Sequence, residues 1–259
     1  MTNKENGIQI YCAGSLREVM GDIGERFRVD YGPRVTVTAG PSGLLRERIE
    51  AGDRPDLFAS ANLEHPRKLK SMKLAGPTVT FARNRLCVMS KAELELTQAN
   101  ILDKLLDPGV RLGTSTPVVD PGGDYAWAMF KKAEELRPGS FRRLTDKARQ
   151  IVRGPTFPPS KPGVLSLIEA FENDEVDLYV AYRTTAHLLI KRVPGIVITE
   201  LPAELEIEAF FGLTLIEGAC AQAGPLALYL LAPEGQRVLA DYGFIPVLET
   251  SECPESSIH

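Results

Sequence analysis

The chain has 259 residues, of which 44% are hydrophobic and 25% are charged, as in ordinary globular proteins. This length is enough for one large domain or for two lobes, each with its own core. The formal net charge of −4, with both signs interspersed, offers no basic surface to a nucleic acid, so no nucleic-acid partner is expected.

A repeated strand–turn–helix pattern occupies the stretch from Ile8 to Ala61. Each β-rich run is followed by a turn of small residues with one serine, and then by a helix whose apolar residues recur at helical spacing. Strands separated by helices in this way form a βαβαβ unit with a parallel sheet. The strands are expected at residues 8–12, 35–38 and 56–59.

Ser15 and Ser42 follow the first two of these strands. In a parallel sheet both serines lie at carboxyl ends of strands and at helix N-termini, where unpaired backbone N–H groups and the positive end of the helix dipole favour an anion. The alternative is structural. Ser15 begins a Ser-x-x-Glu capping box with Glu18, and Ser42 is also a plausible helix cap.

The rest of the chain continues as alternating helices and strands. The pattern predicts helices at 65–73, 94–106, from about 123, at 140–150, 163–171, 184–192 and 226–239, and strands at 78–82, 85–90, 110–113, 176–181, 197–201 and 210–216, before GFIPV closes the fold near 242–247. This order favours two α/β lobes with a ligand cleft between them. Lobe 1 is expected to contain residues 1–83 and 204–259, and lobe 2 residues 84–203.

Motifs for catalysis, metals and membranes are missing. Neither serine turn fits the Gly-x-Ser-x-Gly nucleophile elbow, and His65, His187 and His259 have no evident partner. The four cysteines are scattered, which suits neither a zinc site nor a redox motif. No apolar run approaches the ~20 residues of a membrane-spanning helix. The sequence therefore predicts a binding protein and not an enzyme.

Four stretches resemble the periplasmic molybdate-binding proteins of ABC transporters, a family of molybdate and tungstate substrate-binding proteins. They are YCAGSLREVM, AGPSGLLRERIEAGDRPDLFASA, VDLYVAYRTTA and YGFIPV. The resemblance implies a type II periplasmic-binding-protein fold that holds molybdate or tungstate, without a cofactor, and delivers it to a membrane permease. It also implies a periplasmic location and a monomer. The N-terminus MTNKENG lacks a signal peptide, so either the chain is cytoplasmic or a leader was removed and a Met added.

The family's oxyanion-binding positions map onto five residues. Ser15 and Ser42 would each supply a hydroxyl and a backbone N–H, and Tyr182 a phenol. Gly122 and Lys161 would each supply a backbone N–H. The alternatives are a turn glycine at 122, a solvated lysine at 161 and a core tyrosine at 182.

Asp120 marks a departure from the bacterial pattern. The stretch TSTPVVDPGGDYA also resembles archaeal-type tungstate binders, in which an Asp and a later Glu approach the metal itself. Tyr182 stands where that Glu is expected, so hydrogen-bonded tetrahedral binding is favoured, with Asp120 as an additional candidate. Two other hypotheses stay open: a binder of sulfate or phosphate, and a cytoplasmic oxyanion-sensing module.

Overall fold

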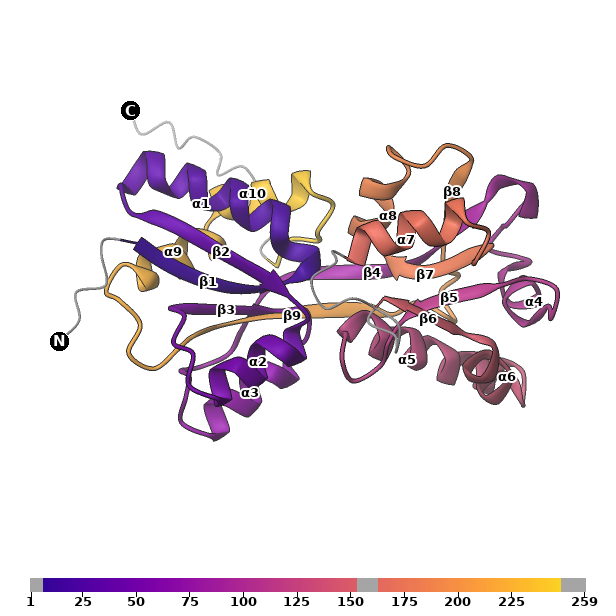
Figure 1. Cartoon of the computed structure of the whole chain (residues 1–259), viewed down its shortest axis with the longest axis horizontal. Coiled ribbons are helices and arrows are strands. Elements are labelled where there is room, and N and C mark those ends of the chain that lie inside the picture. Colours follow the sequence, from indigo (N-terminus) through magenta and orange to yellow (C-terminus); the bar gives the residue numbers. More distant parts are fainter. Residues whose placement is uncertain (1–6, 153–162, 248–259) are drawn as a thin grey trace, which may run out of the picture.

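The computed structural model describes residues 7–152 and 163–247, which form two α/β lobes side by side (Figure 1). The strands are β1 (Gly7–Ala13), β2 (Arg34–Gly40), β3 (Leu57–Ser60), β4 (Val79–Lys91), β5 (Leu112–Ser115), β6 (Arg149–Val152), β7 (Leu178–Tyr182), β8 (Ile196–Glu200) and β9 (Glu208–Leu215). The helices are α1 (Arg17–Tyr31), α2 (Ser42–Glu50), α3 (Glu64–Ser71), α4 (Ile101–Leu106), α5 (Pro121–Leu136), α6 (Ser140–Lys147), α7 (Gly163–Glu172), α8 (Arg183–Leu189), α9 (Ala223–Leu231) and α10 (Pro233–Asp241), with 3-10 turns η1 (Gly14–Leu16) and η2 (Ala92–Leu94).

Lobe 1 is built on the βαβαβ unit that the sequence predicts. β1 pairs in parallel with β2 on one side and with β3 on the other, which confirms that prediction. The next strand across, β9, is antiparallel to β3 and returns from the far part of the chain. Because β1 and β2 point the same way, the turns that follow them meet at one end of the sheet.

Strand β4 passes from one lobe to the other. Its first part, Val79 to Arg85, pairs with β9 in lobe 1, and its second part, from Leu86, pairs with β7 and β8 in lobe 2. Asn84 lies at this change of partner, is fully buried, and donates from Nδ2 to Thr184 Oγ1 at 2.8 Å. The lobe boundaries at 83/84 and 203/204 stay a prediction. The first lies next to the place where β4 changes partner, and the second lies between β8 and β9.

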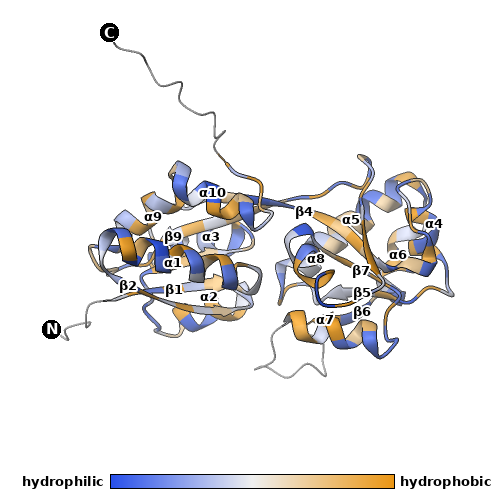
Figure 2. Cartoon of the chain, turned by 90° about the horizontal axis from the view of Figure 1, so that it is seen from above, coloured by the Kyte–Doolittle hydropathy of each residue, from blue (hydrophilic) through white to orange (hydrophobic). Residues whose placement is uncertain are grey.

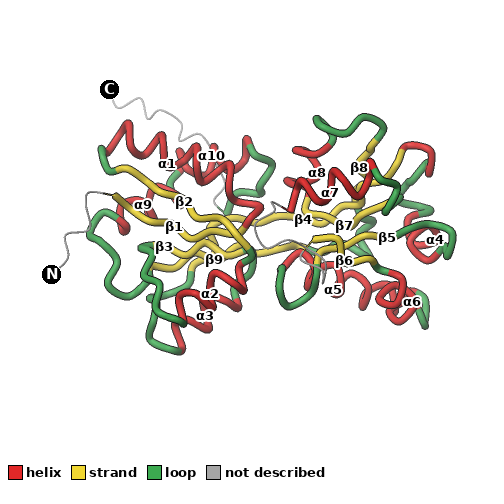
Figure 3. The backbone as a smooth tube through the Cα atoms, in the orientation of Figure 1, coloured by secondary structure: helices red, strands yellow, loops and turns green. Residues whose placement is uncertain are grey.

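In lobe 2, β7 lies between β4 and β5, and β5 pairs in parallel with β6 and β7. Over the described residues the strands therefore run in the order β2-β1-β3-β9-β4-β7-β5-β6, with β8 beside β4. The carboxyl ends of β5 and β7 face the same way, so the segments after them are also neighbours. Figure 3 shows the strands of both lobes running along the length of the molecule.

Helices cover both faces of each half of the sheet. In lobe 1, α1, α9 and α10 lie on one face and α2 and α3 on the other; in lobe 2, α7 and α8 lie opposite α5 and α6 (Figure 1). Apolar residues recur along the helices and strands that pack together, as the hydropathy colouring of Figure 2 shows. One cluster of buried side chains runs from the α1 face of lobe 1 into the α5 face of lobe 2. The two lobes therefore share part of their core.

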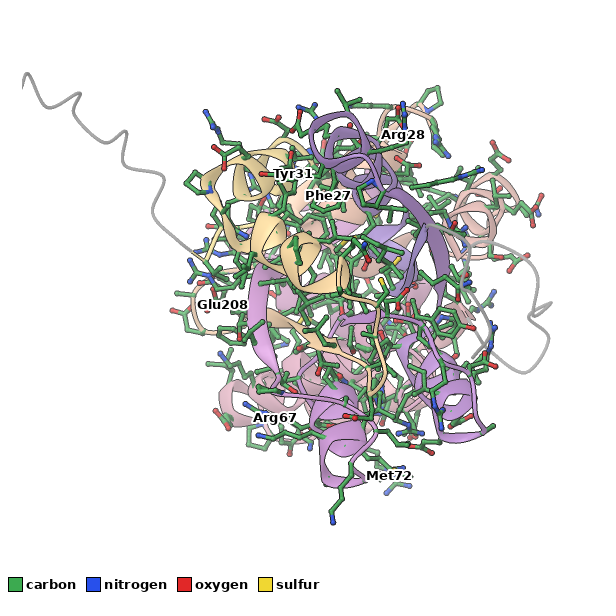
Figure 4. The ribbon with its side chains drawn as sticks, turned by 90° about the vertical axis from the view of Figure 1, so that its left-hand side faces the viewer. Phe27, Arg28, Tyr31, Arg67, Met72 and Glu208 are labelled. Atoms are coloured by element: carbon green, nitrogen blue, oxygen red, sulfur yellow. The ribbon has the colours of Figure 1, made fainter. Side chains whose placement is uncertain are left out.

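An aromatic group closes the end of lobe 1 that is remote from lobe 2. Phe27 and Tyr31, one helical turn apart in α1, stack with ring centroids 4.7 Å apart (Figure 4). Tyr229 of α9 meets both rings edge-on. Such pairs contribute about 0.5–1.5 kcal/mol each beyond the area they bury. They fix α1 against α9 and so fix the turn at the other end of α1.

The structure corrects four predictions of local structure. The strands expected at 78–82 and 85–90 are the single strand β4, and the helix expected at 94–106 is reduced to η2 and α4. The helix expected at 140–150 ends at Lys147, before the unpredicted strand β6, and the one expected at 226–239 is broken at Pro233, which starts α10. No helix within the described ranges is long and apolar enough to cross a membrane.

Candidate functional site

A cavity of about 510 Å³ lies between the lobes. From lobe 1 it is lined by the turns that follow β1 and β2, and from lobe 2 by the ends of β5 and β7 and the first turns of α5, α7 and α8. Four of the five predicted residues line it, as does Asp120: Ser15, Ser42, Gly122 and Tyr182. The fifth, Lys161, lies outside the described residues.

Ser15 lies in the short 3-10 turn between β1 and α1. Its hydroxyl makes no capping hydrogen bond to either helical segment, and its Oγ is buried without a hydrogen-bond partner among the described residues. Burying a hydroxyl without a partner costs about 1–3 kcal/mol. Ala13 holds the cap position of η1 and Leu16 that of α1, so the capping alternative for Ser15 is wrong.

Ser42 is the first residue of α2, and Pro41 holds the cap position. The serine is fully buried, and its Oγ accepts a hydrogen bond from the Ala61 N–H at 3.2 Å. A hydroxyl that accepts one hydrogen bond keeps its own hydrogen for another partner. The hydrogen bond from Ala61 fixes the orientation of the Ser42 hydroxyl and connects the end of β3 to the start of α2.

The two serine turns are also joined to each other. Arg17, the first residue of α1, donates from Nη2 to the carbonyl of Ala39 near the end of β2 at 3.0 Å. The guanidinium therefore bridges the turn that carries Ser15 and the strand that leads to Ser42. Arg17 also lines the cavity, where it adds positive charge beside the two helix N-termini.

Tyr182 ends β7 and immediately precedes α8. Its ring is held by edge-to-face contacts with Tyr125 of α5 and Phe211 of β9, at centroid distances of 6.0 and 5.6 Å. The side chain is 6% exposed, and its hydroxyl is buried with no hydrogen-bond partner among the described residues. Burial raises the pKa of Tyr182 well above its usual value, with Tyr125 and Asp120 adding to the shift. The phenol therefore stays protonated and can donate.

Gly122 and Asp120 form the N-terminus of α5. Asp120 caps this helix by accepting the Gly122 N–H at 2.9 Å through Oδ1, with Pro121 at the first helical position. The backbone donor predicted at Gly122 is thus paired with the Asp120 carboxylate. A ligand that takes this N–H must displace or share that contact.

Ser115 and Tyr179 line the same cavity and were not among the predicted residues. Ser115 ends β5, and its Oγ lies 2.9 Å from the hydroxyl of Tyr179 in the adjacent strand β7. A strand-end serine in TSTP, parallel to the strand that ends at Tyr182, was the signal available in the sequence. It was missed because only the pairing of β5 with β7 brings these residues together.

Charged residues at the cavity face each other across the lobes. Glu18 of α1 and Arg192, just beyond α8, approach to 3.7 Å with both side chains nearly half exposed. An exposed pair of this kind contributes about 0–1 kcal/mol. Among the described residues, no three His, Cys, Asp or Glu side chains gather as they would to hold a metal ion. The donors at the cavity are instead hydroxyls and helix N-termini.

His65, within the helix predicted at 65–73, is a buried residue of α3. It is 8% exposed, its Nδ1 lies 3.4 Å from Arg46 Nη1, and a Cβ placed on Gly43 would lie 3.6 Å from its Cε1. Burial, with Arg46 and Lys68 nearby, lowers the pKa of His65 to about 4. His65 is therefore neutral and packs against the first turns of α2, next to Ser42.

Comparison with known proteins identifies relatives along nearly the whole chain. Residues 8–245 match the family described as bacterial extracellular solute-binding protein. An uncharacterised protein of Pasteurella multocida is 34% identical over 244 residues, which are 94% of this chain and 100% of that one. The molybdate-binding protein ModA of Escherichia coli is 25% identical over 250 residues, 93% of this chain and 89% of the other.

Solved structures share the fold at lower identity. The periplasmic molybdate-binding protein of Azotobacter vinelandii superposes with a TM-score of 0.72 at 17% identity, over 92% of this chain and 98% of that one. The sulfate-binding protein SubI of Mycobacterium tuberculosis gives a TM-score of 0.78 at 12% identity, over 94% and 88% of the two chains. These likenesses confirm the two-lobed periplasmic-binding-protein fold.

Proposed function

The chain belongs to the bacterial extracellular solute-binding protein family, and we propose that it captures molybdate or tungstate between its lobes for an ABC transporter permease. One observation carries this proposal. The hydroxyls of Ser15 and Tyr182, one from each lobe, line one cavity, are buried, and have no partner among the described residues. A tetrahedral oxyanion accepts hydrogen bonds from several directions at once and would satisfy both.

The donor set is suited to a dianion. Each hydrogen bond to a charged group contributes about 1.5–3 kcal/mol, roughly twice the value for neutral partners. The N-terminal turns of α1 and α2 add the positive ends of two helix dipoles on the lobe 1 side. Ser42 can donate to the same ion because its Oγ uses only an acceptor site toward Ala61. Together with the positive charge of Arg17 at the cavity, these groups stabilise the negative charge of the ion.

Closure of the lobes is part of the proposal. One water occupies ~30 Å³ in the liquid, so an ion with four oxygens needs on the order of 100 Å³. The cavity volume of about 510 Å³ is several times larger. The lobes are connected through β4 and β9, whose pairing changes near Asn84. Bending there would bring the two donor walls onto one ion.

The same donors would serve other tetrahedral oxyanions. Hydroxyls and backbone N–H groups do not by themselves separate molybdate from sulfate, and the closed cavity size is what would discriminate. Within the proposal, the protein is a periplasmic monomer, and the permease is its partner. A cytoplasmic sensing role is the outcome favoured if the chain proves to be retained inside the cell.

The proposal is tested by titration calorimetry of the purified protein with molybdate, tungstate, sulfate and phosphate in turn. We expect tight one-to-one binding of the first two ions and little heat from the others. Preferential binding of sulfate or phosphate would replace the ligand and keep the site. Absence of heat with all four ions would overturn the oxyanion-binding function.

A further inference from the structure

The hydroxyl pair Ser115–Tyr179 adds a second polar group to the lobe 2 wall. Tyr179 is 2% exposed, and its hydroxyl lies 2.9 Å from Ser115 Oγ. Ser115 is half-buried and lines the cavity beside α5. A Cβ placed on Gly122 would lie 3.3 Å from Ser115 Oγ, so the serine hydroxyl lies directly beside the predicted backbone donor.

The hydrogen count of this pair leaves one donor unused. Two hydroxyls carry two hydrogens, and the bond between them uses one. Both residues line the cavity, but Tyr179 is almost fully buried in lobe 2, whereas Ser115 is half-buried at the end of β5 and is the more open of the two. If Tyr179 donates to Ser115, the serine hydrogen is directed away from the ring and toward the cavity. Burial raises the pKa of Tyr179, so its phenol keeps the hydrogen that this arrangement needs.

We propose that Ser115 is a further oxyanion-binding residue of lobe 2 and that Tyr179 is its positioning residue. The inference rests on the proposed function, because it assigns a donor to the same ligand. Ser115 gives lobe 2 a side-chain donor beside Gly122, whose own N–H is held by Asp120. With Tyr182, lobe 2 then presents two hydroxyls to the ion, matching Ser15 and Ser42 of lobe 1.

The first test is molybdate titration of Ser115→Ala. We expect a ten- to hundredfold loss of affinity, the worth of about one hydrogen bond to a charged group. Ser140→Ala is the matched control, because Ser140 is a buried lobe 2 serine that does not line the cavity and whose hydroxyl has no partner among the described residues. Its affinity should equal that of the wild type. An unchanged affinity in Ser115→Ala would overturn the inference.

The role of Tyr179 is tested by a double-mutant cycle. Tyr179→Phe should weaken molybdate binding about three- to tenfold in the wild-type background and less than twofold in the Ser115→Ala background, because it acts only through Ser115. Equal losses in both backgrounds would contradict the positioning role. Thermal melting of each ligand-free variant checks that it folds.

The controls separate this inference from the proposed function. If wild-type protein binds molybdate, and Ser42→Ala weakens binding while Ser115→Ala does not, only the Ser115 assignment fails. If wild-type protein gives no heat with molybdate, tungstate, sulfate or phosphate, the proposed function fails and the Ser115 assignment fails with it.

Discussion

The two walls of the cavity are built in different ways. On the lobe 1 wall, each serine follows its strand directly and lies at the start of a helix, and Arg17 ties the two turns together. On the lobe 2 wall, the groups come from the ends of β5 and β7 and from the start of α5. They are hydrogen-bonded in pairs, Ser115 with Tyr179 and Gly122 with Asp120. The lobe 1 wall is the same strand–turn–helix unit used twice, whereas the lobe 2 wall combines segments that are far apart in the sequence.

The two walls also differ in whether their hydroxyl groups contribute to the stability of the fold as well as to binding. Ser42 is tied into lobe 1 by its contact with Ala61, so its hydroxyl contributes to folding as well as to binding. Tyr182 has no such tie, because its hydroxyl has no partner among the described residues. Binding and stability are therefore coupled in the same direction at Ser42 and in opposite directions at Tyr182. Variants that measure both quantities test the contrast.

The largest expected effect falls on the lobe 2 wall, at Gly123. A Cβ there would lie 2.4 Å from Pro117 N and 2.4 Å from the Thr116 carbonyl carbon, both backbone atoms. Gly123→Ala must therefore push the 115–117 turn away from α5. We expect a loss of about 3 kcal/mol or more in the free energy of unfolding, together with weaker molybdate binding. Urea denaturation and calorimetry measure the two losses.

The matched control for this change is Gly21→Ala in α1 of lobe 1. A Cβ at Gly21 meets nothing within 4 Å, and the exposed helical position favours Ala over Gly by about 1 kcal/mol. We expect a small gain in stability and unchanged affinity. If both variants behave alike, close backbone packing does not shape the lobe 2 wall.

The contrast between the walls also explains what could be predicted from the sequence. Strand, small turn and helix follow one another within lobe 1, so Ser15 and Ser42 were identified from local pattern and were placed together by the parallel pairing of β1 with β2. Tyr182 and Gly122 came from resemblance, because no local pattern relates them. Ser115 was missed, since the pairing of β5 with β7 is non-local.

Errors in local structure have equally specific causes. The sequence predicts two strands in place of β4 because the polar Asn84 interrupts the apolar pattern, yet that side chain is buried and donates to Thr184. The first half of β6, Arg149 and Gln150, is predicted as the end of a helix because it continues a polar helical stretch, and its pairing with β5 makes it extended. In both cases tertiary contacts override the local preference.

The next largest effect is a pH dependence on the lobe 1 side. The pKa of His65 falls from 6.5 in the unfolded chain to about 4 in the folded protein. Above pH 6.5 the residue is neutral in both states, and its full contribution to stability is present. As the pH falls toward 4, the unfolded chain binds a proton that the folded protein excludes, so stability drops by on the order of 2–3 kcal/mol.

Chemical denaturation between pH 7.5 and pH 4 measures this loss, and His65→Gln is the comparison because glutamine does not titrate. The variant should remove the part of the pH dependence that lies between pH 6.5 and 4. An identical slope in wild type and variant would show that the lobe 1 wall does not depend on a neutral His65.

At the Ser42 turn, binding and folding should weaken together. Ser42→Ala removes a donor to the oxyanion, at a cost of about 1.5–3 kcal/mol in binding, and leaves the buried Ala61 N–H without its partner, at a cost of about 1–3 kcal/mol in stability. Calorimetry and thermal melting measure both. Ser71→Ala in α3 is the control, because that exposed serine donates to the Lys68 carbonyl and does not line the cavity. Unchanged binding in Ser42→Ala would leave Ser42 with a structural role alone.

At Tyr182, binding and stability should move apart. Tyr182→Phe keeps the ring and its contacts with Tyr125 and Phe211 but removes a buried hydroxyl that has no partner among the described residues. We expect the free energy of unfolding of the ligand-free protein to stay level or to rise by up to about 1 kcal/mol. Affinity for molybdate should fall, by less than in Ser42→Ala. A stability loss without an affinity loss would assign Tyr182 to the core. An affinity loss without a stability loss would mean that the lobe 2 wall keeps the Tyr182 hydroxyl at a cost to folding because the ligand requires it.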